Sequence, residues 1–192
     1  QNLIWGLAQP ITGAVADRFG ARRVIIGGGL LYAAGLALMA GADSAGSLSL
    51  SAGLLIGIGL SGTSFSVLLG VVGRALPAEQ RSIGMGIAAA AGSFGQFAML
   101  PGTLGLIGWL GWSSALLALA MLVALIVPLA LMVRDNPQPA PVGSEQSLVE
   151  ALREACGHSG FWLLALGFFV CGFQVVFIGV HMPSYLVDQH LP

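Results

Sequence analysis

The sequence predicts an all-α integral membrane protein, a polytopic helix bundle with six membrane-spanning segments. Of its 192 residues, 56% are hydrophobic and 8% are charged, and the mean hydropathy is +0.91. Soluble domains carry about 25% charged residues, so this chain has too few charges to coat a surface in water. Its charge-free stretches are long enough to cross a bilayer core of ~30 Å. The seven basic residues are all Arg, and they fall in alternate loops.

Charge-free runs define the segments, because a span needs ~20 apolar residues. The first run is short, and we interpret it as a helix whose start lies outside this chain. The run 82–133 has room for two spans, and the Gly and Trp residues at 108–112 predict a tight interfacial turn between them. The six predicted segments are 1–16, 23–42, 48–73, 82–107, 112–133 and 160–187.

The arginines predict the orientation of the bundle. Every Arg lies in the loops that follow the first, third and fifth segments, and the loops between these hold none. By the positive-inside rule, the Arg-bearing loops are cytoplasmic. We therefore expect a multi-pass protein of the bacterial inner (plasma) membrane, with the lipid bilayer as its partner. The net charge of −1 argues against nucleic-acid binding through a basic surface.

A proline-rich stretch divides the segments into two groups. Three prolines between 135 and 141 prevent a regular helix there. Ser147 and Glu150 then form a capping-box pattern, which predicts a short amphipathic helix running to about Cys156. We predict an N-terminal half at 1–134, a cytoplasmic inter-half loop at 135–159, and the first helix of a C-terminal half at 160–192.

Polar residues are distributed unequally among the segments. Segments 23–42 and 112–133 have almost none in their interiors and are predicted to face lipid. The other four carry polar groups, which are costly in hydrocarbon and should face protein or water around a central cavity. The candidate substrate-binding residues, which form shared helical stripes, are Gln96 with Thr103 and Gln174 with His181.

The stretch Gly59-Leu60-Ser61-Gly62 permits an alternative function. It resembles the G-x-S-G motif of rhomboid intramembrane proteases, in which the Ser is the nucleophile, and His181 would be its base. His181 stands near the end of its segment, however, and helix packing is the simpler role for Ser61. A dinucleotide site at 57–62 would need a preceding strand, which the sequence lacks. No pattern predicts a catalytic group, a cofactor or a metal site.

The most specific motif joins the first two segments. Residues 13–23 read Gly-Ala-Val-Ala-Asp-Arg-Phe-Gly-Ala-Arg-Arg, which resembles the G-x-x-x-D-R-x-G-x-R-R signature loop of the major facilitator superfamily. We predict a five-residue turn that needs Gly20, with Asp17 capping the incoming helix or pairing with an Arg. The residues predicted to form a cytoplasmic gating loop are Gly13, Asp17, Arg18, Gly20, Arg22 and Arg23.

The resemblance covers the whole chain. In that family the signature joins helices two and three, so the six segments would be helices two to seven of a twelve-helix fold, and the chain a fragment. The two apolar segments then become helices three and six, which are peripheral in this fold. The resemblance implies a secondary active transporter of a small solute, coupled to protons or a counter-anion, and not an enzyme.

The last segment points to one branch of the family. Its Gly160-Phe161-Trp162 start and its His181–Asp188 end are similar to monocarboxylate transporter and oxalate/formate antiporter relatives, which implies a monocarboxylate or related organic anion. No Arg or Lys lies inside a predicted span, so we expect the cation that binds such an anion in other helices. His181 could instead couple protons or lie at the outer surface. A non-transporting membrane sensor on the same fold is a further alternative.

Overall fold

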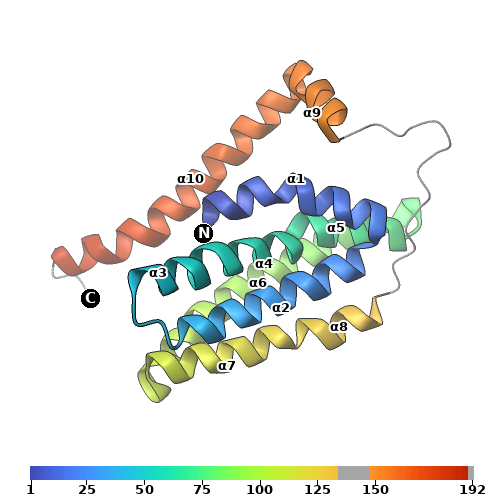
Figure 1. Cartoon of the computed structure of the whole chain (residues 1–192). Helices are drawn as coiled ribbons and strands as arrows, with labels where there is room; N and C mark the ends of the chain where they lie inside the picture. The colour runs from blue at the N-terminus through green and yellow to red at the C-terminus, as the bar shows by residue number, and fades with distance from the viewer. Residues whose placement is uncertain (134–147, 190–192) are drawn as a thin grey trace. The chain divides into compact units, whose positions relative to one another are not determined.

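The computed structural model describes residues 1–133 and 148–189, which are almost entirely helical (Figure 1). The chain forms two compact units, Gln1–Pro139 and Ala140–Pro192. In order along the chain, the first unit contains α1 (Asn2–Phe19), α2 (Ala21–Met39), α3 (Ala45–Leu48), the π-helical segment η1 (Ser49–Leu55), α4 (Ile56–Gly62), α5 (Phe65–Ala75), α6 (Ala78–Leu110), α7 (Trp112–Ala124) and α8 (Ile126–Met132). The second contains α9 (Leu148–Gly157) and α10 (Ser159–Asp188).

Each of the six predicted segments is helical, but they are not equally suited to a membrane. The first, α1, has the polar side chains of Asn2, Gln9 and Thr12 and the charged side chains of Asp17 and Arg18, which lower its hydropathy. It is therefore not among the helices that are long and apolar enough to cross a bilayer. Within the described residues there are five of these: Ala21–Met39, Ala45–Ala75, Ala78–Leu110, Trp112–Met132 and Ser159–Asp188.

Segment 23–42, which the sequence allows to face lipid, has one exposed face and one packed face. The helix formed there, α2, packs against α1, α4, α5, α7 and α8, and Figure 1 shows it running between α4 and α7. Its buried positions include Ile25, Gly28, Gly29 and Leu36. Leu30 and Leu38 on other faces stay exposed. A helix with almost no polar groups in its interior is therefore central here, because its glycines let neighbouring helices come close.

The contact between α2 and α4 is a contact of backbones. A Cβ added at Gly28 would lie 2.8 Å from the Gly59 carbonyl oxygen and 2.9 Å from the Gly62 Cα. A Cβ at Gly59 would lie 2.6 Å from the Tyr32 nitrogen. These separations are too short for any side chain, so only glycine permits this crossing, as in other small-residue contacts between membrane helices. The α2–α4 pair is therefore the most closely packed part of the first unit.

The span Ala45–Ala75 is not one regular helix. It begins with α3, passes through the π-helical η1, and continues as α4 to Gly62. Thr63 (φ −104°, ψ 16°) and Ser64 (φ −68°, ψ 158°) then leave the helical conformation before α5 begins. Interrupted helices occur in transporters where backbone lines a cavity or a protein interior. The interruption separates α4, which packs on both α2 and α1, from α5, which packs mainly on α6 and also meets α2 and α1.

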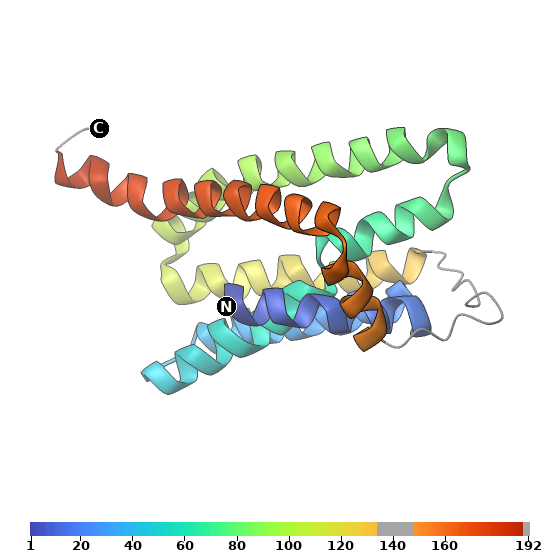
Figure 2. The ribbon, with the colours of Figure 1, turned by 90° about the horizontal axis from the view of Figure 1, so that it is seen from above.

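The long helix α6 lies on the far side of α5 and α7 from α1, α2 and α4, as the view from above shows (Figure 2). It contains Pro101 and has no buried residue. It ends in the turn that the sequence predicts, where Gly111 (φ 75°) alone separates α6 from α7. A positive φ is a conformation that glycine adopts without the steric cost that a Cβ brings.

In the second unit, α9 and α10 meet at a sharp junction. The Trp162 indole N–H donates a hydrogen bond to the Cys156 carbonyl oxygen at 2.9 Å, which ties the start of α10 to the end of α9. Helix α9 confirms the short helix predicted after the proline-rich stretch. The stretch itself and the predicted cap at Ser147 lie outside the described residues.

Candidate functional site

The signature segment is helical rather than a loop, which corrects the predicted five-residue turn. Gly13, Asp17 and Arg18 belong to α1, and Arg22 and Arg23 begin α2. Gly20 is the single residue between the two helices, with φ 92° and ψ 135°. Because glycine takes a positive φ readily, one residue is enough to reverse the chain.

The helical conformation decides where the signature charges lie. Arg18 is in the last turn of α1, where a cation is favoured by the helix dipole, and its guanidinium lies 5.6 Å from the centre of the Phe19 ring. Arg22 and Arg23 are exposed in the first turn of α2. Asp17 lies two residues before the end of α1, and its side chain pairs with the neighbouring helix α5 rather than capping α2.

Asp17 pairs with an arginine that lies 57 positions further along the chain. The Arg74 Nη1 donates to the Asp17 Oδ1 at 3.3 Å, forming an ion pair between α1 and α5. The pairing of Asp17 with an Arg is therefore confirmed, although the sequence did not indicate which Arg. The pair is uneven, because the Arg74 side chain is 26% exposed and the Asp17 side chain 75% exposed.

A cavity of about 300 Å³ lies beside this ion pair, between α1 and α5. Gly13 and Gly70 face it without side chains, and they leave the space open. The ion pair forms one part of its wall and Ser66 another. Its full lining is Gly13, Ala16, Asp17, Ser66, Val67, Gly70 and Arg74. Two residues of the signature motif thus belong to a polar cavity.

Further hydrogen bonds continue the polar contact between α1 and α5. The Ser66 hydroxyl donates to the Gln9 side-chain oxygen at 2.9 Å, and the Ser64 and Ser66 hydroxyl oxygens are 2.9 Å apart. Ser64 is buried and stands at the interruption before α5. A line of polar groups therefore runs from the ion pair at the α1 end to the broken part of the span.

The first pair of predicted substrate-binding residues lies on α6. Gln96 is exposed, and Thr103 is half-buried seven residues further along the same helix. In the first unit α6 packs against α5 and α7. Their role in binding a substrate stays a prediction.

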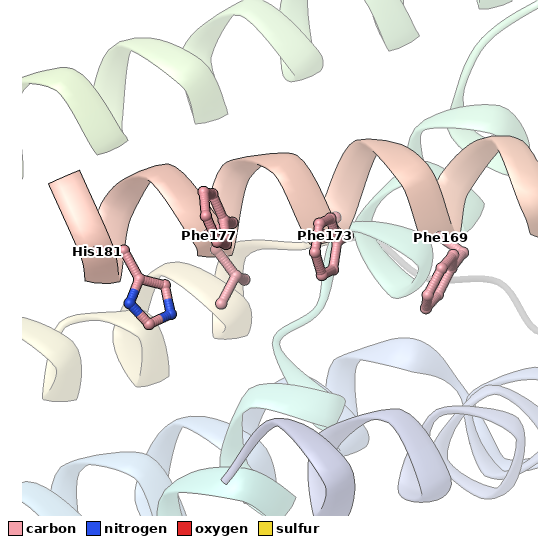
Figure 3. Close-up of a pocket in the computed structure, with 6 residues that line it drawn as sticks. Phe169, Phe173, Phe177 and His181 are labelled. Atoms are coloured by element: carbon pink, nitrogen blue, oxygen red, sulfur yellow. The ribbon is translucent and has the colours of Figure 1, made fainter.

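The second pair lies on α10. Gln174 and His181 are both exposed on this helix. His181 ends a row of aromatic rings, and its ring centre lies 4.9 Å from that of Phe177, as Figure 3 shows. The groove along this row has a volume of about 320 Å³. It is lined by Phe169, Gly172, Phe173, Val176, Phe177 and His181.

Ser61, the proposed nucleophile of the protease alternative, is fully buried in the α4 contact surface. Its hydroxyl donates to the Ile58 carbonyl oxygen at 2.7 Å. A serine satisfied within its own helix has the packing role that the sequence also allowed. Across residues 1–133 and 148–189, no group of three or more His, Cys, Asp or Glu side chains is placed to hold a metal ion.

The fold and the α1–α5 site define a polytopic helical membrane protein whose signature residues join two helices. Comparison with protein families shows a match to the model described as Major Facilitator Superfamily over residues 3–192. The chain therefore belongs to the major facilitator superfamily, whose members are generally transporters of small-molecule solutes in lipid bilayers, and not enzymes. Comparisons with curated proteins and with solved structures find no match.

Proposed function

We propose that this chain is part of a secondary active transporter for a monocarboxylate or related organic anion, working by alternating access. Family membership supports transport of a solute, and the similarity of residues 160–188 to the monocarboxylate and oxalate/formate branch supports the substrate class. In this scheme the chain consists of an N-terminal half at 1–134, an inter-half loop at 135–159 and the start of a C-terminal half at 160–192. The arginine distribution supports an orientation with the α1–α2 turn in the cytoplasm, in a bacterial inner membrane.

The observation that carries the mechanism is the ion pair between Asp17 and Arg74. It joins α1 to α5 at the end of both helices. In alternating access the two sides of the membrane open in turn, so contacts at the cytoplasmic end must form in one state and break in the other. An ion pair with an exposed carboxylate suits this role, because surface pairs stabilise by only about 0.2–1 kcal/mol and break readily. Asp17 and Arg74 would act as a cytoplasmic latch.

The remaining candidate residues would contact the solute. Hydrogen-bonding groups are offered by Gln96 and Thr103 on α6 and by Gln174 and His181 on α10. All are exposed except Thr103, which is half-buried. An amide or imidazole within a membrane span is expected to face protein or water rather than lipid. His181 can also take up a proton, which would couple solute movement to protons.

The latch is tested by Asp17→Asn, which keeps the size of the side chain and removes its charge. We expect normal membrane insertion, because the arginines that direct topology are unchanged, and a several-fold lower uptake of ¹⁴C-labelled mono- and dicarboxylates by cells expressing the protein. The exposed Asp43, in the loop between α2 and α3, provides the matched control Asp43→Asn, which should transport normally. Wild-type uptake by Asp17→Asn would contradict the latch.

A further inference from the structure

The ion pair between Asp17 and Arg74 is poorly balanced. The Asp17 side chain is mostly in solvent, whereas three quarters of the Arg74 side chain is covered, and their closest atoms are 3.3 Å apart. An exposed carboxylate loses little when it leaves a partner for water, because surface ion pairs are weak. A guanidinium that is largely covered, in contrast, costs free energy when no anion lies nearby. Asp17 is therefore the exchangeable member of the pair, and Arg74 is the fixed one.

The cavity gives a second anion access to the same guanidinium. Arg74 lines the cavity of about 300 Å³ together with Ser66 and the two glycines Gly13 and Gly70. This volume is at the lower end of the range for small-molecule sites. Besides the Asp17 carboxylate, which already pairs with Arg74, the lining offers one cation, Arg74, and the side chain of Ser66 on small, otherwise apolar walls. That combination matches a carboxylate of few atoms, because a guanidinium binds carboxylates by parallel N–H···O bonds.

We propose that the α1–α5 cavity binds a small carboxylate, which replaces the Asp17 carboxylate on Arg74 and so opens the latch between α1 and α5. This inference rests on the proposed function, and it places an anion-binding step at the latch itself. The exchange is neutral in charge, since one carboxylate leaves the guanidinium as another arrives. The anion binds the state in which Asp17 has left, and it therefore shifts the latch toward its open form.

The proposal is tested by binding of ¹³C-acetate to the purified chain in lipid nanodiscs. The line width of the acetate signal is measured during titration at constant ionic strength with chloride, and uncharged acetamide is the control ligand. We expect saturable broadening for acetate and none for acetamide. Arg74→Gln should abolish it. Arg81→Gln is the matched control, because Arg81 is exposed, bonds the Leu76 carbonyl oxygen and lies outside the cavity lining.

The sharpest result concerns Asp17→Asn, which removes the competing carboxylate. Acetate should then bind more tightly, by up to about fivefold, the factor expected for loss of an exposed ion pair. Gly70→Ala should weaken binding while keeping both charges, because its methyl group would lie 3.2 Å from the Arg74 Nη1 and displace the guanidinium. Unlike Arg74→Gln, neither change removes a charge that the site needs, so the test does not depend on one variant folding.

Acetate binding that persists in Arg74→Gln would overturn the proposal, as would binding that Asp17→Asn leaves unchanged or weakens. Absence of acetate binding to the wild type would also overturn it. These outcomes differ from failure of the proposed function. If Asp17→Asn impairs uptake but Arg74-dependent binding is absent, the latch stands without the anion exchange. If binding follows the expected pattern but no carboxylate is taken up, transport of carboxylates is the part that fails.

Discussion

Helices α4 and α5 belong to one predicted span, yet they hold their neighbours in opposite ways. In α4, backbone packs directly on α2 where Gly59 and Gly62 meet Gly28. In α5, contact with α1 is made by the Gln9–Ser66 hydrogen bond and the Asp17–Arg74 ion pair, beside an apolar cluster that contains the buried Ala16 and Val67. The two non-helical residues Thr63 and Ser64 divide the two halves.

The difference shows how one span can combine a fixed and a movable part. Backbones in contact cannot slide without collision, because nothing between them can change rotamer. Hydrogen bonds and an exposed ion pair can exchange with water or with a ligand at small cost. Motion of the first unit is therefore expected at the α1–α5 contact, beside the cavity, and not at the α2–α4 contact. The predictions below test that division.

The largest effect is expected for Gly28→Ala. The added methyl group would lie 2.8 Å from the Gly59 carbonyl oxygen, so the two helices must separate, at a cost of about 1–3 kcal/mol or more. The neighbouring Gly27 has nothing within 4 Å of an added Cβ, which makes Gly27→Ala a matched control with no loss. Unfolding by SDS in mild detergent, followed by circular dichroism, gives both free energies. Equal stabilities for the two variants would show that the α2–α4 contact is not close-packed.

A smaller effect is expected where α1 and α5 share a hydrogen bond. Gln9→Ala and Ser66→Ala each remove one member of the bond between the Ser66 hydroxyl and the Gln9 side-chain oxygen. In a double-mutant cycle the coupling free energy should be about 0.6 kcal/mol, the average for side-chain hydrogen bonds between membrane helices. The same SDS unfolding measurement applies to both single variants and the double variant. A coupling as large as the loss in Gly28→Ala would mean that α5 is held as firmly as α4.

Much of this arrangement could be predicted from the sequence, for reasons that differ among its parts. Long charge-free runs predict the helices, and the turn at Gly111 follows from its Gly and Trp residues. The order of charges in residues 13–23 predicts the family. The role of Asp17 could be predicted only in part, because its partner Arg74 is 57 residues away. The charge pattern also predicts that Arg74 lies in a loop, whereas in the structure it belongs to the last turn of α5.

The central position of α2 could not be predicted from the absence of polar groups. A helix face without polar groups is expected to face lipid when its apolar residues are large. Gly28 and Gly29 instead allow another helix to approach closely, and the stability of that contact depends on which residues lie opposite. Only the facing Gly59 and Gly62 make the contact favourable. The polar stripe of Gln96 and Thr103 was expected to face a cavity, and it lies on a helix without buried residues in the first unit. Sequence periodicity defines such a face but not its neighbour.

The smallest effect is expected for Thr12→Val, which tests whether α1 also holds α4 by polar contact. The Thr12 hydroxyl donates to the Ala8 carbonyl oxygen of its own helix at 2.9 Å, and the Ser61 carbonyl oxygen of α4 is further away at 3.4 Å. Because the hydroxyl is satisfied within α1, and valine keeps its shape, the change in unfolding free energy should stay below about 0.5 kcal/mol. Thr63→Val is the matched control, since the Thr63 hydroxyl bonds the Gly59 carbonyl oxygen at 3.1 Å within one segment. If Thr12→Val lowers the free energy of unfolding clearly more than Thr63→Val does, the longer bond to Ser61 stabilises the α1–α4 contact. Helix α4 is then held by polar as well as backbone contacts.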